Sequence, residues 1–190
     1  MTMLGHNNGP TMEGGRSWRK HSWTKARAAL LPTLPIEVVR LRVRRAKELG
    51  LPYKTYASVR ASTGRDVVGF LFSSNALGAH AGSISVPRGA KLRDLQNVAI
   101  AGLALPPLSP DALASLIAAE TGIQPVCGSP PKLSDGWSSA RTKIHLPLKV
   151  MKLPRDGVLV IGETDLEREW SDIGQLAGYL KAETYFATAS

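Results

Sequence analysis

A short apolar run followed by a marked helix start occurs twice in the second half of this chain. Residues 98–105 precede Ser109-Pro110-Asp111, and residues 158–161 precede a capping box from Thr164 to Glu167. Serine and threonine cap helix N-termini, proline suits the first helical turn, and a glutamate three residues after the cap completes the box. The sequence therefore predicts two strand–helix units, with Gly122 ending the first helix, in a small α/β module.

Other segments constrain the fold less. Residues 67–72 form an apolar run too short to separate a buried strand from a helix. Residues 78–97 contain Gly, Ser and Pro, which predicts a long connection with a short strand at 83–86 and a module boundary before it. Residues 124–142 read as a long irregular stretch, and residues 144–153 alternate weakly. The helix after the capping box is expected to present Leu166, Trp170, Ile173, Ala177 and Leu180 on one face.

The net charge is concentrated in the first third of the chain. Residues 1–66 hold thirteen Lys/Arg against four Asp/Glu, and residues 67–190 hold eleven of each. The whole formal charge of +9 therefore belongs to the first segment. Such a segment attracts polyanions, nucleic acid before an anionic membrane.

The basic segment contains the clearest helix pattern, over residues 35–49. Pro35 suits a first turn, and Gly50 is placed to end the helix in a left-handed conformation. The apolar stripe of this helix comprises Ile36, Val39, Val43, Ala46 and Leu49. A second helical segment follows at residues 53–61, with Tyr56 and Val59 as its inward positions.

Residues 42–61 resemble a helix-turn-helix, most closely the short segments of excisionase-like and MerR-like regulators. The motif has a small residue in the first helix, a turn glycine four positions later, a hydrophobic residue after it, and two more in the second helix. Ala46, Gly50, Leu51, Tyr56 and Val59 occupy these positions. The resemblance implies that the second helix enters the major groove of duplex DNA.

The resemblance also assigns candidate contacts. The outward residues of the second helix, expected to face the bases, are Lys54, Thr55, Ser58 and Arg60. The first helix would contact the phosphate backbone through Arg40, Arg44 and Lys47. A basic arm would reach flanking phosphates through Arg16, Arg19 and Lys20.

No pattern points to a catalytic or metal centre. The lone Cys127 excludes an internal disulfide framework, and the four histidines are not paired at metal-ligand spacing. P-loop, nucleophile-elbow and dinucleotide glycine patterns are absent from the sequence. Ser73-Ser74-Asn75, after an apolar run, could deliver hydroxyls to a site but is typical of a plain turn. We expect no cofactor, no metal and no membrane association, in a soluble cytoplasmic protein.

Together these patterns predict an α+β protein in three parts. Residues 1–15 form a disordered leader, residues 16–77 a basic helical DNA-binding module, and residues 78–190 an α/β module for partner binding or dimerisation. The expected function is non-enzymatic binding of duplex DNA, in transcription control or with a mobile element, with a homodimer as a candidate state. Two alternatives stay open: a small nucleotide- or nucleic-acid-acting enzyme using loops 78–97 and 124–142, and an adaptor for an acidic protein.

Overall fold

The computed structural model describes residues 34–79 and 82–187 of the chain. The chain divides into two units, residues 1–39 and residues 40–190. The second unit contains a parallel five-stranded sheet with the order β3-β2-β1-β4-β5. The strands are β1 (Gly69–Ser73), β2 (Ala99–Leu103), β3 (Val126–Gly128), β4 (Val158–Gly162) and β5 (Gly178–Lys181).

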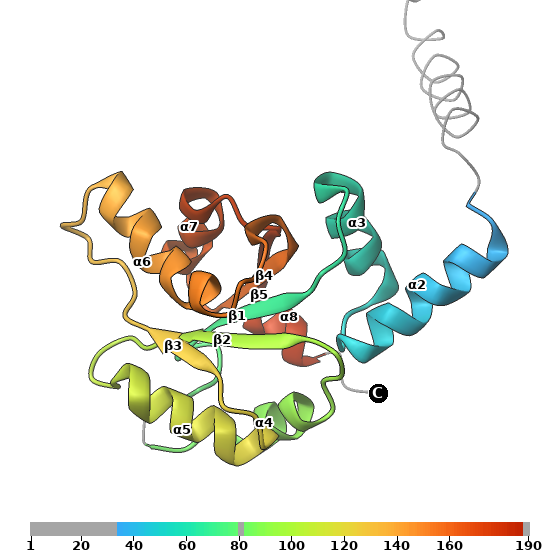
Figure 1. The fold of residues 1–190 in the computed structure, drawn as a ribbon. Coiled ribbons are helices and arrows are strands. Elements are labelled where there is room, and N and C mark those ends of the chain that lie inside the picture. The colour runs from blue at the N-terminus through green and yellow to red at the C-terminus, as the bar shows by residue number, and fades with distance from the viewer. Residues whose placement is uncertain (1–33, 80–81, 188–190) are drawn as a thin grey trace, which may run out of the picture. The chain divides into compact units, whose positions relative to one another are not determined.

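A helix joins each strand to the next. The helices are α2 (Ile36–Glu48), α3 (Tyr53–Thr63), α4 (Val86–Arg93), α5 (Pro110–Thr121), α6 (Trp137–Val150), α7 (Asp165–Gly174) and α8 (Ala182–Ala187), and a 3-10 turn (Arg155–Gly157) precedes β4. Figure 1 shows α4 and α5 on one side of the sheet and α6 and α7 on the other. The sheet is therefore the middle layer of three.

The side chains of β1 alternate between two hydrophobic clusters. Phe70 and Phe72 belong to the cluster that also holds Leu113 of α5, whereas Leu71 belongs to the cluster with Ile144 of α6 and Trp170 of α7. This alternation follows from the period of two in a strand, and a strand buried on both faces reads as a continuous apolar run. Both helical layers are consequently held to the sheet by hydrophobic burial.

The strand order reverses next to β1. The chain passes from β1 outward through β2 to β3, then returns to the other side of β1 to form β4 and β5. This is the order of the doubly wound dinucleotide-binding folds, in which ligands bind beyond the carboxyl ends of the strands at the reversal. A fold alone does not imply a function, so whether a ligand site exists at the reversal has to be judged from the side chains there.

Several elements expected from the sequence are confirmed. Helix α5 begins after Ser109, whose Oγ accepts the Ala112 amide at 3.2 Å, and ends at Gly122 with φ +70°. The capping box is present at α7. Both helices expected in the basic segment form, as α2 and α3, and Gly50 has φ +60°.

The predicted boundary before residue 78 is wrong. Strand β1, which precedes it, is the middle strand of the sheet and pairs with both β2 and β4. Residues 40–77 therefore belong to the same unit as the α/β part and are not a separate module. The finer division into a helical module followed by an α/β module does not hold; mixed α/β architecture around one sheet does. The predicted leader at residues 1–15 lies outside the described residues.

Three local expectations are also corrected. Residues 83–86 form no strand; helix α4 follows instead, with Pro87 in its first turn and Leu92 buried. Residues 124–142 include β3 and the start of α6, and α6 continues into the weakly alternating stretch as far as Val150. Helix α7 ends at Gly174, so Ala177 and Leu180 are not on it; Leu180 lies in β5, and Leu166 is exposed.

Candidate functional site

The corner between α2 and α3 is anchored in the body of the second unit. The Gly50 amide donates to the Lys47 carbonyl and the Leu51 amide to the Ala46 carbonyl, both at 2.9 Å. Ala46, Leu49 and Leu51 are buried in the cluster that contains Phe70 and Phe72. The C-terminal end of α2 and the start of α3 are thus fixed in the core of the second unit.

Arg45 fixes α2 to the rest of the unit. Its guanidinium donates to Glu48 at 2.9 Å, to Asp66 at 3.2 Å, and to the carbonyls of Val67 and Asn97 at 3.0 Å each. These partners use its donors on both sides of the planar fork. Arg45, although basic, is a structural residue with little capacity left for an external ligand.

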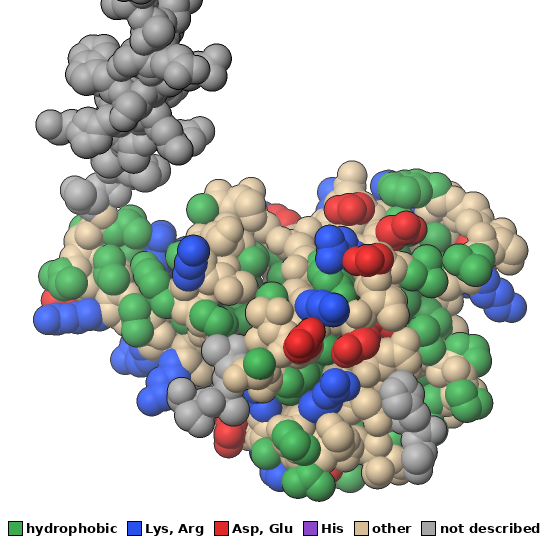
Figure 2. All heavy atoms as spheres, turned by 180° about the vertical axis from the view of Figure 1, so that it is seen from behind, with side chains coloured by type: hydrophobic (Ala, Val, Ile, Leu, Met, Phe, Trp, Pro, Cys, Tyr) green, Lys and Arg blue, Asp and Glu red, His purple; other side chains and the backbone are tan. Residues whose placement is uncertain are grey.

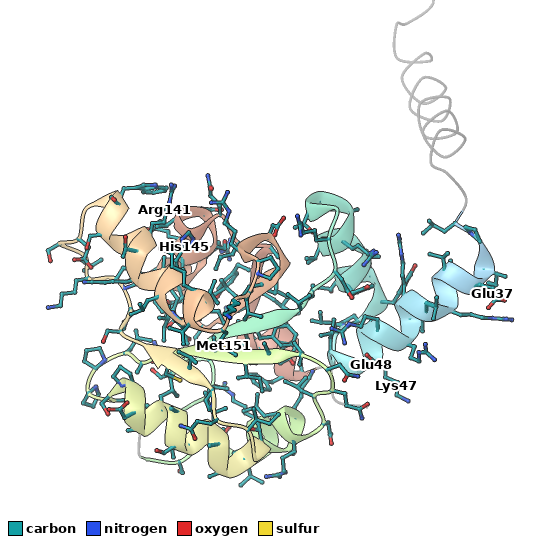
Figure 3. All side chains as sticks on the ribbon, in the orientation of Figure 1. Glu37, Lys47, Glu48, Arg141, His145 and Met151 are labelled. Carbon is teal, nitrogen blue, oxygen red and sulfur yellow. The ribbon has the colours of Figure 1, made fainter. Side chains whose placement is uncertain are left out.

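The other basic residues of α2 have a different environment. Arg40, Arg44 and Lys47 are exposed, and their spacing of four and three residues places them on one side of the helix. Within the described residues, the side chains of Arg44 and Lys47 have no hydrogen-bond or ion-pair partner, whereas Arg40 has an interaction inside the protein. Figure 3 shows Lys47 beside Glu48 at the C-terminal end of α2. The expected phosphate-contacting residues are therefore presented to solvent.

Hydrophobic side chains lie exposed on the same helix. Val43 is 47% and Leu41 55% exposed. The stripe expected from the sequence is therefore buried only at its C-terminal end, at Ala46 and Leu49. In Figure 2, basic and hydrophobic side chains are neighbours on the α2 side, whereas acidic and basic side chains lie next to one another near the middle of the face.

The second helix corrects part of the expected contact set. Lys54 and Ser58 are exposed, but Thr55 and Arg60 are half-buried. The Arg60 guanidinium lies 3.4 Å from the Tyr56 hydroxyl and 3.6 Å from the Asp66 carboxylate. Helix α3 therefore does not present four free polar side chains on one face. The arm residues Arg16, Arg19 and Lys20 lie outside the described residues.

Sequence reasoning missed Asp66, which joins α3 to α2 and to the start of β1. Its carboxylate accepts the Tyr56 hydroxyl at 2.8 Å, the Val67 amide at 2.9 Å and the Arg45 guanidinium at 3.2 Å. Burial, and then the hydrogen bond to Asp66, raise the pKa of Tyr56. The available signal was that Asp66 is the one acid between Glu48 and Asp94 in the sequence.

The reversal point of the sheet is the other place to look for a site. The segment after β1 is closed by its own hydrogen bonds: Ser73 Oγ accepts the Ala76 amide at 2.9 Å, and Ser74 Oγ accepts the Leu105 amide at 3.0 Å. The Gly78 amide donates to the Asn75 carbonyl at 2.8 Å. These hydroxyls and amides hold a turn, so they do not form a cradle of free N–H groups for a phosphate.

The polar side chains at this edge also bind one another. Buried Glu167 accepts the Asn75 amide at 2.8 Å and the Thr164 amide at 3.2 Å. Arg88 donates to the Asn75 and Ala76 carbonyls, and its Nη2 lies 3.7 Å from Glu163. With Glu163 and Glu167 at the start of α7, the edge is acidic and unfavourable for an anionic ligand.

The remaining reactive residue types have structural surroundings. Burial raises the pKa of the Cys127 thiol to about 12, which removes the reactive thiolate at neutral pH. Arg141 and His145 reach from α6 to the last carbonyls of α7, at Ile173 (2.9 Å) and Gly174 (2.8 Å) (Figure 3). Across residues 34–79 and 82–187, no cluster of His, Cys, Asp and Glu is arranged to hold a metal ion.

No helix in the described part of the chain is long and apolar enough to cross a membrane. Comparison with protein-family models, curated proteins and solved structures finds no match to this chain. The class of protein is therefore defined by its fold, a doubly wound parallel α/β unit with a basic helix pair packed on it. Its function has to be argued from its own side chains.

Proposed function

We propose that this protein binds duplex DNA through the outer side of α2, with phosphates as the groups contacted. The observation that carries the proposal is the row formed by Arg40, Arg44 and Lys47. These three bases are exposed on one side of a helix whose C-terminal end is fixed in the core. A rigid row of cations on a positively charged segment suits the regular spacing of phosphates along a duplex.

Lys54 and Ser58 of α3 extend the same proposal, because both are exposed on the helix that follows. A hydroxyl and an ammonium group contact phosphate oxygens readily but carry little sequence information by themselves. Affinity without strong sequence choice is therefore expected of the described part. Use of this binding in transcription control or by a mobile element, in the cytoplasm and as a homodimer, belongs to the same proposal.

Deleting residues 1–66 would be a poor test, because Ala46, Leu49, Leu51 and Tyr56 belong to the core. The better test replaces Arg44 and Lys47 with glutamine and leaves the apolar residues unchanged. Binding of fluorescent duplexes is measured by anisotropy at several salt concentrations. Loss of two phosphate contacts should lower the slope of log K against log salt by about 1.8.

A matched control removes the same number of positive charges from another part of the surface. Lys149 and Lys152, at the end of α6, are also exposed. Their double glutamine variant should bind DNA as the unchanged protein does. Equal losses in the two double variants would show only a general charge effect, and absence of binding by the unchanged chain would refute the proposal.

An acidic protein partner is the competing interpretation of the same row of cations. A competition experiment distinguishes the two interpretations. If the protein binds DNA, unlabelled duplex should displace the labelled duplex at a far lower concentration, counted as negative charges, than polyglutamate does. Displacement by both at equal charge would favour the adaptor interpretation. The reversal point does not favour the enzyme interpretation, because Asn75, Glu167 and Arg88 are hydrogen-bonded within the protein there. Glu163 Oε2 is buried without a hydrogen bond and lies 3.7 Å from Arg88.

A further inference from the structure

Asp66 has two arginine neighbours, which it holds in different ways. Arg45 is tied by a 3.2 Å hydrogen bond from Nε to Asp66 Oδ2 and by further bonds to backbone carbonyls. Arg60 lies opposite the other carboxylate oxygen, Oδ1, with its Nη1 at 3.6 Å. That distance makes an ion pair without a direct hydrogen bond.

The position of Arg60 makes it exchangeable. Its side chain is 32% exposed, and its hydrogen bond to the Tyr56 hydroxyl is long, at 3.4 Å. If Arg60 moved away, Asp66 would keep the Tyr56 hydroxyl, the Val67 amide and Arg45. Neither carboxylate oxygen would then be left without a partner, so release of Arg60 has a small cost inside the protein.

We infer that Asp66 competes with nucleic-acid phosphate for Arg60. The inference rests on the proposed function, and it assigns Asp66 as a positioning residue. In the free protein Asp66 and the Tyr56 hydroxyl hold the Arg60 side chain on the side of α3 that carries Tyr56, which is not the side that carries Lys54 and Ser58. On binding, Arg60 exchanges a weak ion pair for a phosphate, and Asp66 limits the affinity that this arginine adds.

The charges around Asp66 are consistent with local competition. Arg45 forms an ion pair with Glu48 at 2.9 Å. Arg65, which precedes Asp66 in the chain, forms an ion pair with Asp156 at 2.6 Å. Among the described residues, Asp66 is the one acidic partner of Arg60, and the two lie 3.6 Å apart, beyond hydrogen-bond distance. Removing the charge of Asp66 should release Arg60, whereas Arg45 keeps its bonds to Glu48 and to the Val67 and Asn97 carbonyls.

The test uses Asp66→Asn, Arg60→Gln and the double variant in the full chain, with salt-dependent anisotropy on duplexes of unrelated sequence. Asp66→Asn should raise affinity about three- to tenfold at about 100 mM salt and steepen the salt slope by about 0.9, the value of one added phosphate contact. Adding Arg60→Gln should abolish the gain. A gain that persists in the double variant, or no gain at all, overturns the inference.

Asp94→Asn is the control for net charge. Asp94 is exposed at the end of α4, and its replacement adds the same charge without releasing an arginine. Its effect should be smaller than that of Asp66→Asn and should not depend on Arg60. An equal gain that is insensitive to Arg60→Gln would reduce the role of Asp66 to its net charge.

Asp66→Asn also removes a hydrogen bond from Arg45, so its folding is checked by circular dichroism. If Asp66→Asn does not fold, the inference is tested by comparing the loss of DNA affinity in Arg60→Gln with the loss in Arg44→Gln, each in the otherwise unchanged chain. Replacing Arg60, which is paired with Asp66, should lower the DNA affinity less than replacing the exposed Arg44. Equal losses of affinity contradict the inference. Failure of the proposed function itself is distinct, because then the Arg44/Lys47 double variant binds as the unchanged protein does.

Discussion

Replacing Gly50 by alanine tests whether the α2–α3 corner depends on a left-handed residue packed against the core. Gly50 has φ +60°, a region that costs an L-residue about 1–2 kcal/mol. A Cβ at this position would also lie 2.9 Å from Lys91 Cε and 3.6 Å from the Tyr185 hydroxyl. Gly50→Ala therefore has two costs, one from the backbone and one from contact.

The contact cost comes from the surroundings of Lys91. This side chain is buried, its ammonium donates to the Tyr185 carbonyl, and it lies 4.2 Å from the centre of the Tyr185 ring. Moving Lys91 Cε disturbs that hydrogen bond, which is worth about 1 kcal/mol net. Together with the backbone cost, Gly50→Ala should lower the free energy of unfolding by about 2–3 kcal/mol.

Gly64 supplies the matched control. It ends α3 with φ +71°, and no atom lies within 4 Å of an added Cβ. Gly64→Ala should therefore show the backbone cost alone, about 1–2 kcal/mol. Urea unfolding followed by circular dichroism measures both variants. The reasoning is refuted if Gly50→Ala costs no more than Gly64→Ala, or if either leaves stability unchanged.

Three further predictions concern the body of the fold. Glu167→Ala leaves the Asn75 side-chain amide and the backbone amides of Glu163 and Thr164, just before α7, without their acceptor, and should cost about 3–5 kcal/mol in urea unfolding, whereas exposed Glu169→Ala should cost under about 0.5 kcal/mol. Burial lowers the pKa of Lys91 from 10.5 to about 8, so the unfolded chain binds more protons between those values. Stability should therefore rise from about pH 8 to about pH 10, and Lys91→Met should flatten this rise. Cys127, with its pKa raised to about 12, should resist iodoacetamide at pH 8 in the folded protein and react once urea unfolds it, as mass spectrometry can follow.

The sequence predicted correctly the helices whose ends are marked by capping residues. Helix α5 is bounded by a Ser109 cap and a left-handed Gly122, and both act within a few residues of the backbone groups they satisfy. The same is true of the capping box at α7 and of Gly50 after α2. These motifs were readable because their partners are close in sequence.

Elements that depend on distant partners were missed or misplaced. Helix α4 is short, and its N-cap residue Ser85 makes no side-chain cap hydrogen bond, so its stability depends on the burial of Leu92 and Lys91 against the body. Strand β5 is stabilised by its pairing with β4. Its four residues are mostly half-buried and have no sequence pattern that would predict that pairing. The module boundary failed for the same reason, since the central place of β1 depends on strands that come later in the chain.

The candidate site divides in the same way. The sequence by itself determined where the positive charge lies and that Arg40, Arg44 and Lys47 share one side of a helix, because charge and helical period are local properties. Only the tertiary structure decided which bases remain available. Arg45 and Arg60 face Asp66, and that carboxylate meets them because α2, α3 and the start of β1 pack at one corner. Availability of a charged side chain depends on neighbours brought together by folding, which spacing along the chain does not encode.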